Sequence, residues 1–268
     1  MQRVRHFYRE LAAGRLLVAF QPVVALPALG HILYHEALLR HSSAFRQPFA
    51  PFARLEKLGM MLRLDLSVMS TVIQRLRLHP DLSLSCNISA QSAILAEGWQ
   101  PLLQQLLEEP EVACRLVIEI TESAATPDIP MAVDFVNAMR STGCRIAVDD
   151  FGSGYSTLEF ILQSRPDIIK IDQGYMKRAR TNPLGRTTLS HLLPLCKSLA
   201  PCVIVEGIET RADSEMVNDL GGEWGQGYLL GRPSLETLGA PCKVLAAFQP
   251  PVPGDWPPRH EATESDKG

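Results

Sequence analysis

The sequence predicts an α/β protein, a TIM-like (β/α)8 barrel with an antiparallel strand at the start. Eight short runs rich in Val, Ile and Leu alternate with longer amphipathic segments. The first two runs are too close together for a helix to connect them, and polar residues recur near the ends of the runs. A doubly wound open sheet is the alternative that this alternation leaves open.

The eight runs have the short, apolar character of buried parallel strands. In chain order they are Leu16–Leu26, Ile32–Arg40, Leu82–Ser89, Leu116–Thr121, Arg145–Asp150, Ile168–Asp172, Val203–Ile208 and Gly225–Leu230. The first two are separated only by a turn around Pro27–Gly30, which predicts an antiparallel hairpin.

Helical patterns fill most of the gaps between these strands. Apolar residues at spacings of three and four predict helices over Pro51–Leu78, Leu95–Leu107, Ile129–Met139, Thr157–Gln163, Leu189–Leu199 and Ala212–Leu220. We expect Pro101 near the start of the second helix. Residues 1–248 are assigned to one domain, and residues 249–268, which hold five prolines, to a flexible Pro-rich C-terminal tail.

Composition limits the functional classes that fit the chain. Hydrophobic residues make up 46% and charged residues 21%, as in ordinary globular proteins. The net charge of −3 excludes a strongly basic surface, so we expect no binding of duplex nucleic acid. The six cysteines form no C-x-x-C pair, and the chain has no long apolar run. We therefore expect reduced thiols, no membrane span and a cytoplasmic location.

Polar residues fall on or just before the end of almost every predicted strand. They are Glu36, Asn87, Glu119, Asp149, Asp150, Lys170, Glu206 and Gln226. Because strand C-termini meet at one face of a barrel, we expect these side chains to form one cluster. Any single carboxylate there could be a helix cap or a salt-bridge partner. Five carboxylates packed together require compensation, and an all-oxygen ligand set favours Mg²⁺ or Mn²⁺.

Adjacent aspartates at one strand end, here Asp149 and Asp150, can offer one carboxylate that bridges two ions and another that binds the second ion alone. Two such ions are typical of in-line displacement at phosphorus. Lys170 has two functional interpretations, a Schiff base as in an aldolase or a charged group that orients water or a phosphate oxygen. Its carboxylate neighbours favour the second, and a structural salt bridge remains open.

A series of motifs runs in order over about residues 8–240. They are Gln21-Pro22, Glu36-Ala37-Leu38-Leu39-Arg40, Asn87-Ile88-Ser89, Glu119-Ile120-Thr121-Glu122, Asp149-Asp150-Phe151-Gly152-Ser153-Gly154-Tyr155-Ser156, Lys170-Ile171-Asp172, Glu206-Gly207-Ile208-Glu209-Thr210, Gln226-Gly227-Tyr228 and Arg232-Pro233. Together they resemble the EAL-domain family of cyclic di-GMP phosphodiesterases. The stretch after Arg40 departs from the family pattern.

The resemblance implies a stand-alone enzyme that opens one phosphodiester of cyclic di-GMP to give linear pGpG and so lowers the level of this second messenger. It implies catalytic roles for Glu36, Lys170 and Glu206. The implied ligands of two Mg²⁺ or Mn²⁺ ions are Glu36, Asn87, Glu119, Asp149, Asp150 and Glu206. The implied substrate contacts are Gln21, Leu38, Arg40, Asp172, Gln226, Arg232 and Pro233. The implied supporting residues are Glu122, Phe151, Gly152 and Glu209.

The resemblance also implies a homodimer and leaves room for a regulatory protein partner. An alternative from a different class is a non-catalytic cyclic di-GMP receptor or protein-binding regulator. The complete set of metal ligands favours the enzyme.

Overall fold

A computed structural model describes residues 9–11, 13–27, 30–43, 55, 61–121, 128–153, 158–235 and 242–244. Glu122, most of the first ten residues of the helix predicted from Pro51, and the predicted tail lie outside these residues.

One mixed sheet forms the centre of the molecule. Its strands are β1 (Leu16–Ala25), β2 (Ile32–His41), β3 (Leu84–Ser89), β4 (Leu116–Thr121), β5 (Arg145–Phe151), β6 (Ile168–Ile171), β7 (Cys202–Glu206), β8 (Trp224–Gln226) and β9 (Cys242–Lys243). Strands β2 to β8 run parallel in order, and β1 is antiparallel to both β2 and β8. Because β1 joins the first and last parallel strands, the sheet closes into a barrel. This closure confirms the predicted fold and excludes the open sheet.

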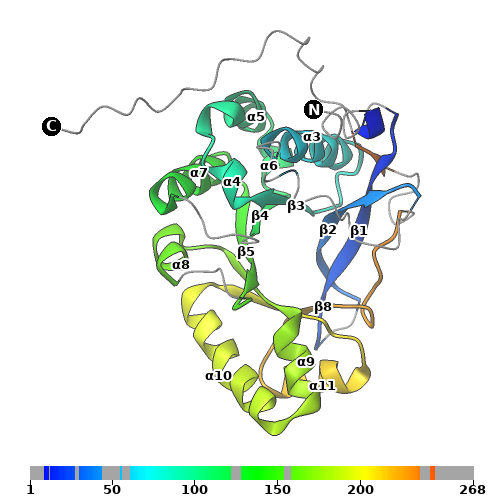
Figure 1. Ribbon diagram of the computed structural model, residues 1–268, viewed down its shortest axis with the longest axis vertical. Helices are drawn as coiled ribbons and strands as arrows, with labels where there is room; N and C mark the ends of the chain where they lie inside the picture. Colours follow the sequence, from blue (N-terminus) through cyan, green and yellow to red (C-terminus); the bar gives the residue numbers. More distant parts are fainter. Residues whose placement is uncertain are drawn as a thin grey trace, which may run out of the picture.

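Helices surround much of the barrel (Figure 1). They are α3 (Met61–Leu78), α4 (Ala90–Ala93), α5 (Ala96–Glu108), α6 (Pro110–Ala113), α7 (Ile129–Ser141), α8 (Leu158–Ser164), α9 (Gln173–Thr181), α10 (Pro183–Leu199) and α11 (Arg211–Asp219). In the view of Figure 1 the β1–β2 hairpin lies at the edge opposite α7 and α8. None of the helices within the described ranges is long and apolar enough to cross a membrane.

The structure differs from the predicted helices at Pro101 and at α9. Pro101 was expected near a helix start but lies inside α5, which begins at Ala96. A proline removes one main-chain donor, and the buried side chains of Trp99, Leu102 and Leu106 stabilise the helix by packing. Helix α9 was not predicted, because only Met176 and Ala179 of its residues are buried and its apolar periodicity is therefore weak.

The last parallel strand is shorter than the predicted Gly225–Leu230. Strand β8 ends at Gln226, because the chain turns at Gly227, whose carbonyl accepts the main-chain N–H groups of Leu230 and Gly231. An added Cβ at Gly227 would overlap main-chain atoms of Ile208, so the close approach of these two segments requires glycine.

The barrel interior has an apolar floor. A separate buried cluster consists of Val23, Tyr34, Val117, Ala147, Ile168 and Ile204. Five of the predicted polar residues follow members of this cluster by two positions: Glu36 after Tyr34, Glu119 after Val117, Asp149 after Ala147, Lys170 after Ile168, and Glu206 after Ile204. Residues two apart on a strand share a face. The polar side chains therefore lie inside the barrel, above this floor.

Strand register brings the polar residues to a common level. Asn87 pairs with Glu119 across β3 and β4, and Glu206 pairs with Gln226 across β7 and β8. Because strands tilt in a barrel, inward-facing residues at the same height on neighbouring strands differ from the paired register by an even number of positions, here zero or two. Glu36 lies in the middle of β2, as it does in the predicted strand Ile32–Arg40, and it pairs with Gln21 of β1.

Candidate metal centre

Lys170 lies at the centre of a buried cluster of carboxylates. Its Nζ is 3.2 Å from an oxygen of Glu36, 2.8 Å from Glu119, 2.9 Å from Asp149 and 2.9 Å from Glu206. The Lys170 side chain is only 1% exposed. Burial alone would lower the pKa of Lys170, but the four carboxylates raise it well above its ordinary value. The ammonium therefore stays charged, which disfavours the Schiff-base interpretation.

Two amides orient the Glu36 carboxylate. Asn87 Nδ2 donates to Glu36 Oε1 at 2.8 Å, and Gln226 Nε2 donates to Glu36 Oε2 at 2.6 Å. Burial would raise the pKa of Glu36, but Lys170 and these two hydrogen bonds outweigh it and leave the pKa below its usual value. Glu36 is therefore an ionised, fixed carboxylate.

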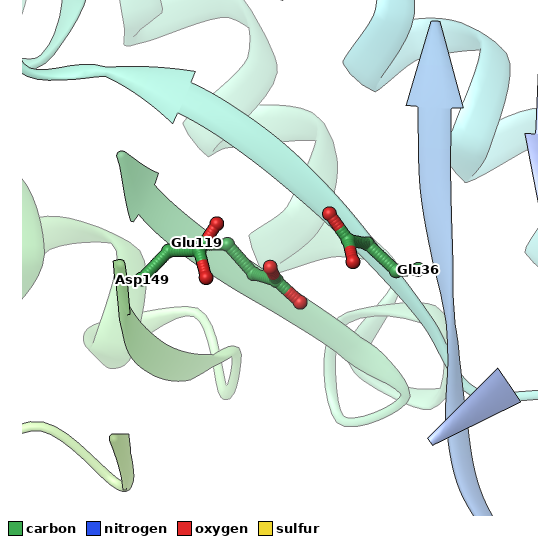
Figure 2. A group of neighbouring side chains, drawn as sticks. All are labelled: Glu36, Glu119 and Asp149. Carbon is green, nitrogen blue, oxygen red and sulfur yellow. The ribbon is translucent and has the colours of Figure 1, made fainter. Parts of the chain in front are cut away.

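Two groups of three carboxylates have oxygen atoms close enough to share a metal ion. Glu36, Glu119 and Asp149 form the first group, and Asp149, Asp150 and Glu206 form the second, with ligand atoms within 4.8 Å of one another in each. Figure 2 shows the three side chains of the first group, from three different strands, pointing toward one another. Asp149 belongs to both groups, which is the arrangement expected of a ligand that bridges two ions.

The second group depends on an unusual backbone conformation. Asp150 has a φ of 54°, in the left-handed region that non-glycine residues rarely adopt. This conformation lies at the end of β5, where the β5–β6 register shifts between Val148 and Phe151. The strain at Asp150 is consistent with a carboxylate that is held for function.

Three buried oxygens of the cluster have no hydrogen-bond partner within the described structure: Asn87 Oδ1, Glu119 Oε1 and Gln226 Oε1. A buried acceptor without a partner costs free energy, roughly 1–3 kcal/mol. Asn87 and Glu119 are predicted ligands, and a hard cation would satisfy both oxygens. The donor set is entirely oxygen, so the residues present fit Mg²⁺ or Mn²⁺.

The raised pKa values of two carboxylates also indicate that the cluster lacks positive charge when no cation is bound. Burial raises the pKa of Glu119 to about 8, although Lys170 opposes this shift. Burial and the neighbouring Asp149 raise the pKa of Asp150 to about 7. Lys170 neutralises only one of the five carboxylates. Five carboxylates, this ammonium and two divalent cations would leave no net formal charge.

A cavity of about 370 Å³ opens beside the cluster. Among its lining residues are the predicted Gln21, Glu36, Leu38, Glu206, Glu209 and Gln226. The cavity is also lined by residues that the sequence did not single out as ligands: Gln173, Lys177, Gly207, Gly227 and Tyr228. Gln173 and Lys177 are four residues apart on α9, directly after β6, a spacing that could have identified them.

The other predicted substrate contacts lie around this cavity or close to it. Arg40 is buried, its Nη1 donates to the carbonyl of Leu39 at 2.9 Å, and its Nε has no hydrogen-bond partner within the described ranges. The Arg232 guanidinium lies 4.2 Å from the ring centroid of Tyr228. Pro233 follows Arg232. Asp172 accepts the N–H of Gly174 at 2.9 Å and so caps α9.

The predicted supporting residues lie in the loops beside the cluster. Phe151 is buried and pairs with Ile171. Gly152 has a φ of 85°, and its carbonyl accepts the Tyr175 hydroxyl at 3.3 Å. Glu209 forms an ion pair with Arg180 at 3.0 Å. The roles implied for all site residues stay predictions.

Comparisons with known proteins identify the family to which this sequence is similar. The profile of the EAL domain matches residues 4–233. The bifunctional diguanylate cyclase/cyclic di-GMP phosphodiesterase MucR of Pseudomonas aeruginosa is 29% identical over 243 residues, which are 87% of this chain and 35% of that protein. The chain thus spans only 35% of the length of this relative.

Solved structures share the fold. The PaMucR phosphodiesterase in complex with c-di-GMP is 29% identical with a TM-score of 0.71, and the match covers 87% of this chain and 98% of that chain. An EAL domain protein from Listeria monocytogenes is 24% identical with a TM-score of 0.75, and the match covers 86% of this chain and 93% of that chain. Because the EAL profile covers most of the sequence, the chain belongs to the EAL domain family.

Proposed function

We propose that this protein hydrolyses cyclic di-GMP to linear pGpG with the help of two Mg²⁺ or Mn²⁺ ions. The observation that carries the proposal is the pair of carboxylate groups that share Asp149. The names of the relatives support the substrate, since a relative 29% identical to this chain is a cyclic di-GMP phosphodiesterase. A cytoplasmic location, a homodimer and a regulatory protein partner are further parts of this proposal.

The ion ligands would be divided between the two groups. Glu36, Asn87, Glu119 and Asp149 would hold the first ion, and Asp149, Asp150 and Glu206 the second. Ions bound there supply positive charge to the phosphoryl oxygens and make water more acidic. The amides of Asn87 and Gln226 hold Glu36 in a fixed orientation, so little reorganisation is needed when the site fills.

Lys170 is the group of this chain that is best placed to act on the phosphate. Its Nζ is within 3.2 Å of four carboxylates, all of which are proposed ion ligands. The Lys170 ammonium would keep its charge beside these carboxylates and would donate to a phosphoryl oxygen or orient the attacking water. The apolar floor beneath keeps this chemistry away from bulk water.

The cavity beside the cluster would hold the nucleotide. Gln21 and Leu38 line it on the side of β1 and β2, and Tyr228 lines it after β8. Gly207 and Gly227 also line it, and their lack of a Cβ lets these segments pack against Gln173 and Ile208. Lys177 gives this otherwise acidic lining a positive charge suited to a phosphate.

The test is chromatography of cyclic di-GMP incubated with purified protein and either Mg²⁺ or Mn²⁺. We expect pGpG from the wild type and a loss of at least about 100-fold in Glu36→Gln, which keeps the shape of the side chain and removes its charge. Glu215→Gln is the matched control, because Glu215 is an exposed residue of α11 outside the metal cluster. Binding of cyclic di-GMP without pGpG under either metal would support the receptor alternative and refute the enzyme.

A further inference from the structure

Arg180 of helix α9 forms ion pairs with two carboxylates, Asp213 and Glu209, that lie outside the metal cluster. Arg180 Nε donates to Asp213 Oδ1 at 2.8 Å, and Arg180 Nη2 lies 2.8 Å from Asp213 Oδ2. This two-pronged geometry is the strong form of an arginine–carboxylate pair. Burial would raise the pKa of Asp213, but the hydrogen bond from Arg180 and those from main-chain N–H groups lower it below its usual value. The pair is therefore ionised.

The same guanidinium holds the loop that follows β7. Arg180 Nη2 donates to the carbonyl of Gly207, the residue directly after Glu206, and Nη1 donates to Glu209 Oε2 at 3.0 Å. Asp213 in turn accepts the main-chain N–H groups of Glu209 at 2.9 Å and of Thr210 at 2.8 Å. The loop is thus fixed through a carbonyl, two N–H groups and a carboxylate.

The opposite side of α9 contacts the loop after β5. Tyr175 donates its hydroxyl to the carbonyl of Gly152, and an added Cβ at Gly152 would overlap this tyrosine. An added Cβ at Gly207 would press against Gln173, also on α9. The helix therefore packs closely against both segments that carry Asp150 and Glu206, two ligands of the second group.

Glu206 needs this support more than the other three carboxylates around Lys170. Its side chain is 15% exposed, the highest value among the four carboxylates around Lys170. Within the described part of the chain, the Lys170 ammonium is the one hydrogen-bonding group that the structure places on its carboxylate. Glu206 pairs with Gln226 but is the last residue of β7, so its orientation is set partly by the main chain at Gly207, where the loop begins.

We propose that α9 is a brace for the second ion site and that Arg180 is its positioning residue. Arg180 acts through Gly207 on Glu206 and does not touch the ions or the substrate. The first ion site is expected not to depend on it, because Glu36, Asn87 and Glu119 lie inside β2, β3 and β4, whereas Glu206 is the last residue of β7. This inference rests on the proposed two-ion function.

The test is a titration of the metal-depleted protein with Mn²⁺, followed by calorimetry. The wild type is expected to bind two ions. Arg180→Met is expected to bind the first ion as the wild type does and the second about 10-fold or more weakly, the usual effect of removing a group that orients a metal ligand. Arg180→Lys keeps the positive charge but cannot form the paired hydrogen bonds to Asp213, so its affinity for the second ion should lie between those of the wild type and Arg180→Met.

Arg115→Met is the matched control. Arg115 also clamps main-chain carbonyls, those of Leu76, His79 and Leu82, but it lies at the start of β4, away from the cluster. Its loss should lower the melting temperature and leave both ions unchanged. At a temperature where both variants are folded without metal, turnover of Arg180→Met should recover at high Mn²⁺, whereas Arg115→Met should show the Mn²⁺ dependence of the wild type.

The outcomes separate the two proposals. A wild type that binds two ions and an Arg180→Met variant that binds both equally well would overturn the role of Arg180 alone. A wild type that binds fewer than two Mn²⁺ ions would overturn the two-ion function and the brace with it.

Discussion

Replacing Lys170 with methionine removes the ammonium that lies between four buried carboxylates and keeps a side chain of similar length. Glu119 is fully buried and Lys170 is 1% exposed, so bulk water cannot replace the lost charge. Removing one partner of a buried ion pair costs about 3–5 kcal/mol. In a domain of this size each kcal/mol shifts the melting temperature by about 2–4 °C. Metal-free Lys170→Met is therefore expected to melt about 6–20 °C below the wild type.

Divalent cations should reduce this difference, because they bring positive charge to the same carboxylates. The assay is thermal unfolding of both proteins in EDTA and in saturating Mg²⁺. The matched control is Lys197→Met, whose Nζ lies 2.9 Å from Glu223 Oε1 with side chains 40% and 65% exposed. Such an exposed pair contributes less than about 1 kcal/mol. A Lys170→Met protein that melts with the wild type in EDTA would refute the central position assigned to Lys170.

Three further predictions follow from the cluster and its loops. Metal-free protein should lose stability as pH rises from about 5 to about 8, because burial raises the pKa of Glu119 to about 8 and the folded state therefore holds a proton that the unfolded state has released. Glu36 is ionised in both states over this range and does not contribute to the trend. Mg²⁺ should abolish this dependence of the melting temperature on pH. Asn87→Ala should weaken binding of the first Mn²⁺ ion at least about 10-fold in a calorimetric titration, and unchanged affinity would show that Asn87 is not a ligand. Gly227→Ala should lower the melting temperature by several degrees, because its Cβ overlaps the main chain of Ile208, and an unchanged melting curve would contradict the close approach of these segments.

Much of the barrel could be predicted from local pattern. Strand β4 has the predicted bounds, and the short turn between β1 and β2 correctly indicated an antiparallel start. These features depend on apolar periodicity and on loop length, which are local properties of the sequence. Helix α9 could not be found in this way, because its stability comes from contacts with α10 and β7 and not from an apolar stripe of its own.

The cluster itself could be predicted because polar residues near strand ends converge in a barrel. The hydrogen bonds that Asn87 and Gln226 donate to Glu36 could not, since they depend on side-chain contacts between three different strands. The link from Arg180 to Asp213 and Gly207 was also invisible, because it joins residues from different elements about 30 positions apart, at separations of 33 and 27. Register and side-chain contacts of this kind depend on the tertiary fold.

The most direct test of the proposed function is the addition of Mg²⁺ or Mn²⁺ to metal-depleted protein in the presence of cyclic di-GMP, with pGpG measured over time. We predict no product without metal, and a rate that rises with more than the first power of metal concentration as the second site fills. Absence of pGpG at every concentration of both metals, from folded protein, would contradict the proposed function.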